Sequence, residues 1–180
     1  MSLPDGPRAN IEVKARLGDL DAAIRTAQSL GARDSGADRQ VDTYFRVPHG
    51  RLKIRQSLFV GEQLILYMRP DVAAPRRADY EVLPAPRGGR TRELLELMLG
   101  IEVVVEKVRR LFVLGDTRIH LDTVKDLGDF IEFEAVYPYG LTSAEAAALH
   151  DVNRLMGAFA LSSADLVPHS YRELLLATGR

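Results

Sequence analysis

Alternating apolar and polar residues run through much of this chain and predict a protein rich in β-strands. In the first such segment, residues 10–17, Ile11 and Val13 fall on one face and Glu12 and Lys14 on the other. Glycine and proline punctuate the later segments, and Gly115 begins a two-residue turn typical of a β-hairpin. The expected strands, about eight in all, are residues 10–17, 40–45, 51–56, 63–69, 77–82, 103–114, 118–124 and 130–136.

Helical periodicity interrupts the strands. Asp19 is a candidate N-cap for a first helix, and Gly31 marks its end. A long helix should open at the capping-box pattern of Thr142 and Glu145 and run to about residue 159. A last helical stretch is expected at residues 171–176. Residues 70–75 and 84–89 are predicted loops, and a short helix should follow the second of them, with its buried side made of Leu94, Leu95 and Met98.

Length and composition indicate one globular domain over residues 1–180, with residues 1–9 as a loose lead-in. A formal net charge of −1 gives no global reason to expect nucleic acid or a membrane surface as a partner. No cysteine is present, so thiolate metal sites and a cysteine nucleophile are excluded. No apolar run is long enough to span a membrane, and no export signal precedes the first strand, which favours the cytoplasm.

Charged residues gather on the polar faces of the predicted strands. Such a face is either the solvated side of an open sheet or the lining of a closed barrel. Helices need the apolar faces to pack on, which favours an α+β fold in which helices lie outside a closed antiparallel barrel. A lumen crowded with cations would repel itself unless it bound a polyanion, and its carboxylates could hold Mg²⁺ or Mn²⁺. The charged residues of these faces are Glu12, Lys14, Arg16, Arg51, Lys53, Arg55, Lys107, Arg109, Arg118, His120, Asp122, Glu132 and Glu134.

Several segments carry a family resemblance. Residues 10–14, Asn-Ile-Glu-Val-Lys, resemble the Glu-x-Glu-x-Lys signature of the CYTH, or triphosphate tunnel metalloenzyme, superfamily. The similarity continues in order through residues 41–45, 52–55, 106–109, 121–122, 127–132 and 170–172. The branch that looks most similar contains the class IV adenylyl cyclases. The resemblance implies an eight-stranded triphosphate tunnel and a metal-dependent enzyme.

The resemblance also implies roles for individual residues. It implies metal ligands at Glu12, Glu132 and Glu134, with Glu81 as a further acidic candidate. Phosphate contacts and catalytic groups would be Lys14, Lys53, Arg55, Arg69, Lys107, Arg109 and Asp122. The implied cofactor is Mg²⁺ or Mn²⁺, and the implied partner is a small-molecule triphosphate such as ATP, tripolyphosphate or thiamine triphosphate. A homodimer is compatible with the resemblance.

Three functions remain open at this point. The first is a cyclase that converts ATP to cyclic AMP and pyrophosphate. The second is a hydrolase of inorganic triphosphate, thiamine triphosphate or a nucleoside triphosphate. The third is a nucleotide- or polyphosphate-binding module without catalysis, suggested by Asn10, which stands where the signature has its first glutamate.

Residues outside this pattern are weaker candidates for a functional role. The four histidines have no metal-ligand spacing and are expected to be structural or at the surface, although His120 shares a face with Asp122. Arg76 and Arg77 could cover the mouth of the tunnel, but a position at the surface is expected. Tyr171 is explained equally well by burial in the last helix and by the family resemblance.

Overall fold

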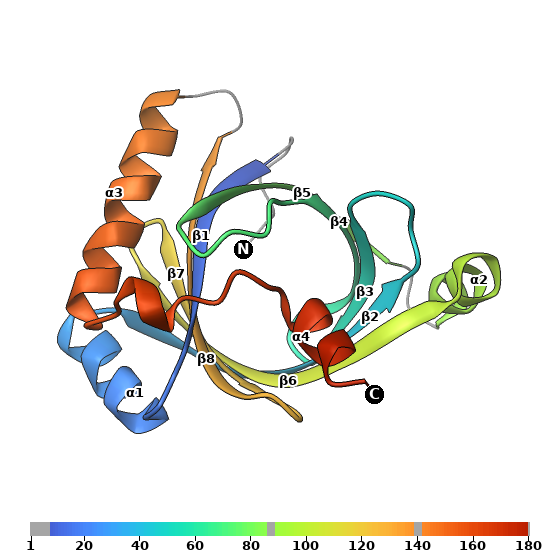
Figure 1. Ribbon diagram of the computed structural model, residues 1–180, viewed down its shortest axis with the longest axis horizontal. Coiled ribbons are helices and arrows are strands. Elements are labelled where there is room, and N and C mark those ends of the chain that lie inside the picture. The colour runs from blue at the N-terminus through green and yellow to red at the C-terminus, as the bar shows by residue number, and fades with distance from the viewer. Residues whose placement is uncertain (1–7, 86–88, 139–141, 180) are drawn as a thin grey trace.

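The computed structural model describes residues 8–85, 89–138 and 142–179. Its strands close into one antiparallel barrel in the order β1-β5-β4-β3-β2-β6-β7-β8, as the ring of arrows in Figure 1 shows. This confirms the predicted fold class and number of strands. The strands are β1 (Arg8–Arg16), β2 (Arg33–Phe45), β3 (Arg51–Ser57), β4 (Gly61–Met68), β5 (Arg76–Pro84), β6 (Ile101–Leu114), β7 (Thr117–Val124) and β8 (Gly128–Pro138).

Helices pack outside the barrel and across one of its openings (Figure 1). Helices α1 (Leu20–Ser29) and α3 (Thr142–Ala158) cover the wall formed by β1, β7 and β8. Helix α2 (Arg90–Leu99) stands at the side of the barrel, and the short α4 (Tyr171–Ala177) lies across the opening. A 3₁₀ turn, Ser163–Asp165, precedes α4. Within the described residues no helix is both long and apolar enough to cross a membrane.

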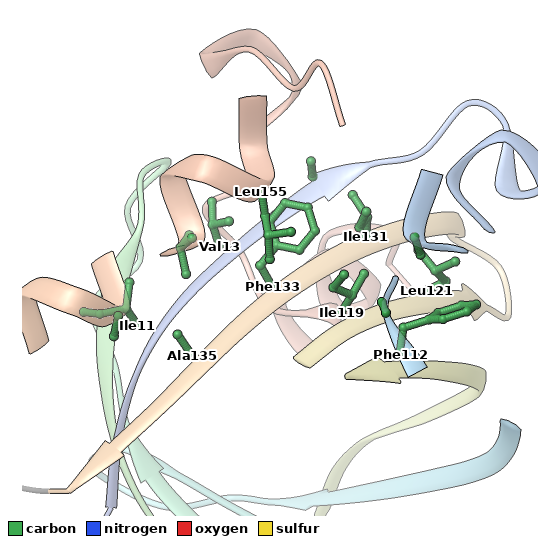
Figure 2. Close-up of a cluster of buried hydrophobic side chains, with 14 of the residues drawn as sticks. Ile11, Val13, Phe112, Ile119, Leu121, Ile131, Phe133, Ala135 and Leu155 are labelled. Carbon is green, nitrogen blue, oxygen red and sulfur yellow. The ribbon is translucent and has the colours of Figure 1, made fainter. Parts of the chain in front are cut away.

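The main hydrophobic core lies between the barrel wall and the outer helices, and not inside the barrel. Figure 2 shows Val13 of β1 and Ile131 and Phe133 of β8 on the same side of the wall as Leu155 of α3. These side chains are 1% exposed or less. Complete burial of each contributes roughly 1.5–3 kcal/mol to stability. The apolar strand faces are therefore used by the helices, and the polar faces line the lumen.

A second, smaller cluster closes one end of the barrel. Tyr171 and Leu175 of α4 pack there against Val105 and Phe130. The ring centroids of Phe130 and Tyr171 lie 5.0 Å apart in an edge-to-face arrangement.

The pairing of β1 with β5 and β8 sets the geometry of one wall of the lumen. Glu12 of β1 is paired in register with Arg76 of β5 and Glu134 of β8, and Lys14 is paired with Glu132. Residues directly opposite on adjacent strands point to the same face. Two glutamates consequently face each other across β1 and β8.

Two expectations about the elements were wrong. Strand β2 begins at Arg33 rather than at residue 40, with a register irregularity between Asp34 and Ala37. Helix α2 has no buried residue, and the exposed fractions of Leu94 and Met98 are 42% and 75%. The expected lead-in falls mostly on residues 1–7, outside the described residues, and β1 already begins at Arg8. The expected loop at 84–89 includes residues 86–88, which also lie outside them.

Candidate functional site

Charged side chains from seven of the eight strands, and from Arg69 just after the end of β4, line the barrel interior. Most of the expected residues are among them, drawn together from positions as distant in sequence as β1 and β8. Basic groups outnumber carboxylates, so the interior has an excess of positive charge. The basic residues are Lys14, Lys53, Arg55, Arg69, Arg76, Lys107, Arg109 and Arg118, and the acidic residues are Glu12, Asp42, Asp122, Glu132 and Glu134.

Asp42 organises the basic groups of β3. Its carboxylate accepts hydrogen bonds from Lys53 Nζ at 2.8 Å and from Arg55 Nε and Nη2 at 2.7 and 2.8 Å. Lys107 Nζ lies 3.7 Å from the same carboxylate. Burial alone would raise the pKa of Asp42, but the charges of Arg55, Lys53 and Lys107 hold it well below its usual range. Asp42 is therefore an anion that fixes three cations toward the lumen.

Asp122 has the same role on β7, which β6 separates from β2. It accepts two hydrogen bonds from Arg109, at 2.6 and 2.5 Å, and one from the Tyr171 hydroxyl at 2.9 Å. Lys107 Nζ lies 3.8 Å away, between the two aspartates. With these partners Asp122 positions Arg109. Tyr171, which the sequence left between two explanations, is both buried and part of this network.

Glu12 lies at the other side of the lumen with two arginines. Arg69 Nη1 donates to Glu12 Oε1 at 2.5 Å, and Arg76 Nε lies 3.5 Å from the same oxygen. The sequence placed Arg76 at the surface, which was wrong, because its side chain is only 2% exposed. Arg76 begins β5 directly after a predicted loop, so no preceding alternation could assign its face.

Arg69 and Arg76 keep hydrogen-bonding capacity that the described residues do not use. The Nε and Nη2 atoms of both make no hydrogen bond there, although Arg69 Nη2 lies 3.5 Å from Asp71. Arg69 is 3% exposed at its side chain. Buried guanidinium donors without partners are costly, and a bound anion would satisfy them.

Burial also acts on the lumenal lysines. Burial, and then the positive charge of Arg55, lower the pKa of Lys53 to about 8. Burial and Arg109 lower the pKa of Lys107 well below its usual value, and burial lowers that of Lys14 even though Glu132 opposes the shift. The Lys14 ammonium lies 3.8 Å from the centroid of the Tyr171 ring. Burial thus disfavours the charged form of each lysine, and an anionic ligand would favour that form.

Glu132 and Glu134 stand on β8 beside these cations. Glu132 Oε2 accepts from Arg109 Nη2 at 3.2 Å, and Glu134 accepts from Asn10 Nδ2 at 2.6 Å and from Arg118 Nη1 at 3.2 Å. Burial, and then the charge of Arg109, lower the pKa of His120 to about 3. The imidazole next to Glu134 is therefore neutral at neutral pH.

Two residues from the sequence patterns do not reach the lumen. Glu81 is exposed on the outer face of β5. Arg16 is exposed at the end of β1, where its Nη1 donates to the Leu127 carbonyl oxygen at 3.3 Å. The sequence reasoning missed Asp42, although the motif at residues 41–45 contains it and its spacing with Tyr44 gave a usable signal.

A divalent cation fits the β1–β8 wall chemically. Glu12 and Glu134 face each other there, and the buried Asn10 Oδ1 has no hydrogen-bond partner among the described residues. Carboxylate and amide oxygens are the donors that hard cations prefer. No group of three His, Asp or Glu side chains in the described ranges converges as a metal site, and basic groups contact the carboxylates of Glu12 and Glu134. Glu12, Glu132 and Glu134 would hold the ion once one of those groups moved aside.

Fold and interior together define a class of protein: a closed β-barrel whose buried, positively charged lumen suits a polyanion. Residues 8–171 match the CYTH domain family, and the chain therefore belongs to it. This is a family of metal-dependent triphosphate tunnel enzymes, and its members are adenylyl cyclase-like enzymes or triphosphatases.

Several solved structures share this fold. The PH1012 protein of Pyrococcus horikoshii is 25% identical, with a TM-score of 0.73 over 92% of this chain and 98% of that one. A protein of Vibrio parahaemolyticus described as a candidate adenylate cyclase is 22% identical, with a TM-score of 0.78 over 93% and 97%. A candidate adenylyl cyclase of Hippeastrum, reported to have a dominant triphosphatase activity, is 15% identical, with a TM-score of 0.59 over 95% and 96%. A comparison with curated proteins gave no match.

Proposed function

We propose that this protein binds a triphosphate inside the barrel and cleaves one of its P–O–P linkages with the help of Mg²⁺ or Mn²⁺. The observation that carries the proposal is the set of buried guanidinium donors on Arg69 and Arg76 that have no hydrogen-bond partner in the described ranges. They add to a lumen in which Lys14, Lys53 and Lys107 are buried with lowered pKa values. A ligand with many anionic oxygens satisfies both features.

Phosphoryl transfer asks the protein mainly for positioning and charge stabilisation. In this lumen Asp42 would hold Lys53 and Arg55, and Asp122 would hold Arg109, with their N–H groups directed at phosphate oxygens. A divalent cation held by Glu12, Glu132 and Glu134 would offset the negative charge of the leaving phosphate group. Because the basic groups are fixed before the ligand arrives, little reorganisation accompanies the reaction.

Two reactions suit such a site. In an adenylyl cyclase-like reaction the ribose 3′-oxygen bonds to the α-phosphorus, pyrophosphate leaves, and the hydroxyl proton passes to solvent. In a triphosphatase reaction a water oxygen bonds to the terminal phosphorus, the bridging P–O bond breaks, and the diphosphate leaves. The attacked phosphorus becomes orthophosphate, and the water proton passes to solvent. The family resemblance of the sequence favours the first.

One observation favours hydrolysis. The lumenal tyrosines already contact cations: the Lys14 ammonium lies over Tyr171, and Lys53 Nζ lies 5.1 Å from the Tyr44 ring centroid and 5.7 Å from that of Tyr67. A base-stacking platform needs an aromatic face that is free. A triphosphate without a base needs no such face.

Substitution of two adjacent arginines on β5 tests the binding step. Arg76 faces the lumen, and the half-buried Arg77 pairs with Asp79 at 2.8 Å on the outer face. Arg76→Met should weaken tripolyphosphate binding by about 1.5–3 kcal/mol, the range for a charge-assisted hydrogen bond. Arg77→Met, its matched control, should bind as the wild type does. Equal affinities of the three proteins in titration calorimetry would remove the tunnel as the binding site.

Product analysis separates the reactions. The purified chain is supplied with ATP, tripolyphosphate or thiamine triphosphate and with Mg²⁺ or Mn²⁺. Cyclic AMP identifies the cyclase, and orthophosphate identifies the triphosphatase. Tight binding without turnover identifies the non-catalytic module. The homodimer remains a prediction that sedimentation of the same preparation can check.

A further inference from the structure

Asp38 of β2 holds the side-chain amide of Gln40 in one orientation. Asp38 Oδ2 accepts from Gln40 Nε2 at 2.9 Å and from Ser57 Oγ at 2.6 Å. Asp38 Oδ1 accepts from the backbone amide of Leu58 at 3.0 Å. A carboxylate only accepts hydrogen bonds, so the Gln40 amide must turn its nitrogen toward Asp38. The amide oxygen, Oε1, is thereby left free to bind something else.

This amide oxygen lies on the lumenal face among charged neighbours. Gln40 is paired in register with Lys107 of β6 and with Ser57 of β3. Asp42, the next residue on the same face of β2, binds Arg55. Gln40 is only 8% exposed, and within the described ranges its Oε1 atom has no hydrogen-bond partner. A buried acceptor of this kind is costly unless a donor occupies it.

The group that occupies Gln40 Oε1 must be a hydrogen-bond donor. Ionised phosphate oxygens are acceptors, and they bind instead to N–H groups such as those of Lys107, Arg55 and Arg109. Arg109 is paired in register with Asp38, and Lys107 with Gln40 itself, so the acceptor borders the cations that would hold the phosphates. In both reactions of the proposed function, an O–H group must stand beside the phosphates in order to attack phosphorus.

We propose that Gln40 Oε1 accepts a hydrogen bond from the attacking oxygen and orients it toward the phosphorus, which makes Gln40 a catalytic residue. The attacking oxygen is that of water in hydrolysis and that of the ribose 3′-hydroxyl in the cyclase-like reaction. As it bonds to phosphorus, the bridging P–O bond breaks, and the leaving phosphate group takes the electron pair. The O–H proton passes to solvent, because an amide oxygen orients the nucleophile without removing its proton. The inference deepens the proposed function and rests on it.

Asp38 is a positioning residue that acts through Gln40. Asn has the same shape as Asp, but its side-chain nitrogen is a donor. In Asp38→Asn the Leu58 amide still needs the acceptor at the Oδ1 position, so the nitrogen takes the place of Oδ2. That nitrogen would donate to Gln40 Oε1 and turn the amide over. The lumen would then meet an N–H group where the attacking oxygen needs an acceptor.

Steady-state kinetics on the triphosphate that the wild-type chain turns over tests the role of Gln40. Gln40→Leu should lower kcat about a hundredfold, since a small misplacement of the reacting atoms costs about that much. KM and the affinity for tripolyphosphate should hardly change, because Gln40 gives the phosphates no donor. Gln56→Leu is the matched control, because Gln56 donates to Glu62 at 2.9 Å on the outer face of the barrel and should keep the wild-type kcat.

A second variant separates orientation from folding. Asp38→Asn should lower kcat as Gln40→Leu does, again with KM nearly unchanged. The double variant should be no slower than Gln40→Leu alone, because Asp38 acts only through Gln40. If the two losses of kcat multiplied in the double variant, or if KM rose as much as kcat fell, Gln40 would not orient the nucleophile.

The wild-type protein shows which proposal has failed. Turnover by wild type that both single variants retain in full would reject the role of Gln40 and leave the proposed function standing. Binding of ATP, tripolyphosphate or thiamine triphosphate without any turnover would reject the proposed cleavage itself, and the role of Gln40 with it.

Discussion

At the scale of one residue, Lys53 shows how burial of a charge in the lumen lowers the stability of the folded chain. Its ammonium is buried between Asp42 and Tyr44, and its pKa falls from 10.5 to about 8 because of burial and then the charge of Arg55. The unfolded chain therefore holds this proton more tightly than the folded chain. Between pH 8 and pH 10.5 the unfolded state binds more protons, so this group makes the free energy of unfolding rise with pH in that window.

Lys53→Met should remove this cost. We expect the free energy of unfolding at neutral pH to rise by on the order of 1–3 kcal/mol, since each pKa unit corresponds to 1.36 kcal/mol and Asp42 retains Arg55. Its rise between pH 8 and pH 10.5 should flatten. Tripolyphosphate affinity should fall at the same time. Urea denaturation across pH measures the first two effects, and calorimetry measures the third.

The control for this prediction is Lys125→Met. Lys125 is exposed and pairs with Glu106 at 2.7 Å on the outer surface. Its loss should leave tripolyphosphate affinity unchanged and should not stabilise the chain. The prediction would be wrong if Lys53→Met were less stable than wild type and its free energy of unfolding still rose with pH as in wild type. The buried charge of Lys53 would then not destabilise the fold.

The sequence predicted much of the site at this scale because alternation is a local property. Lys14, Lys107 and Arg109 were placed on inward faces by their spacing with neighbours, and the structure puts them there. Pairing between strands is not local. The contact between Asp42 and Lys53 depends on the register of β2 and β3. The contact between Tyr171 and Asp122 depends on where the C-terminal helix docks.

At the scale of elements, α4 connects stability to the lumen. A helix of 7 residues does not form alone, because too few hydrogen bonds offset nucleation. Ser170 caps it reciprocally with Glu173, Arg51 Nε donates to Glu173 at 3.2 Å, and Arg172 pairs with Glu102 of β6 at 2.5 Å. These contacts hold Tyr171 beneath Lys14 and against Asp122.

Ser170→Ala should therefore lower both stability and ligand affinity. Loss of an N-cap costs about 1 kcal/mol. Displacement of Tyr171 should loosen Lys14 and Arg109, so that tripolyphosphate binds more weakly. Amide exchange over residues 171–177 should quicken, which hydrogen-exchange mass spectrometry would show.

Asp19→Ala is the matched variant at another helix. Asp19 Oδ1 accepts from the Ala22 amide at 2.8 Å and caps α1, which packs outside the barrel. Its loss should cost a similar free energy of unfolding. Tripolyphosphate affinity should stay unchanged. If both variants weakened binding equally, α4 would have no special relation to the lumen.

Element prediction succeeded where an apolar face had a partner and failed where it had none. Helix α1 begins after the expected cap at Asp19, and β6 and β7 are joined at the expected turn after Leu114. Helix α2 has the apolar residues of a buried helix but packs little against the barrel, so Leu97 is 82% exposed. The first part of β2 was missed because it is rich in polar residues and glycine, although it pairs with β6 on both sides of the irregularity between Asp34 and Ala37.

At the scale of the whole molecule, the barrel separates two kinds of interior. The apolar core outside the wall stabilises the fold. The lumen destabilises it in part, because an excess of positively charged groups is buried there away from solvent. An anionic ligand that binds only the closed barrel must reverse that cost. Ligand at one hundred times its dissociation constant adds about 2.7 kcal/mol to the free energy of unfolding.

Proton uptake is the signature of this coupling. In the free protein Lys53 has a pKa of about 8, so near that pH part of the population lacks the charge. A triphosphate in the lumen stabilises the ammonium form and raises its pKa, so binding near pH 8 should draw protons from the buffer. Titration of tripolyphosphate in two buffers of different ionisation heat counts those protons. Protons that the ligand itself binds or releases contribute equally in all proteins tested. The informative comparison is therefore between wild type and Lys53→Met, and binding to the variant should take up fewer protons. Equal proton counts in the two proteins would mean that the phosphate chain does not reach Lys53, and the ligand would then have to bind elsewhere.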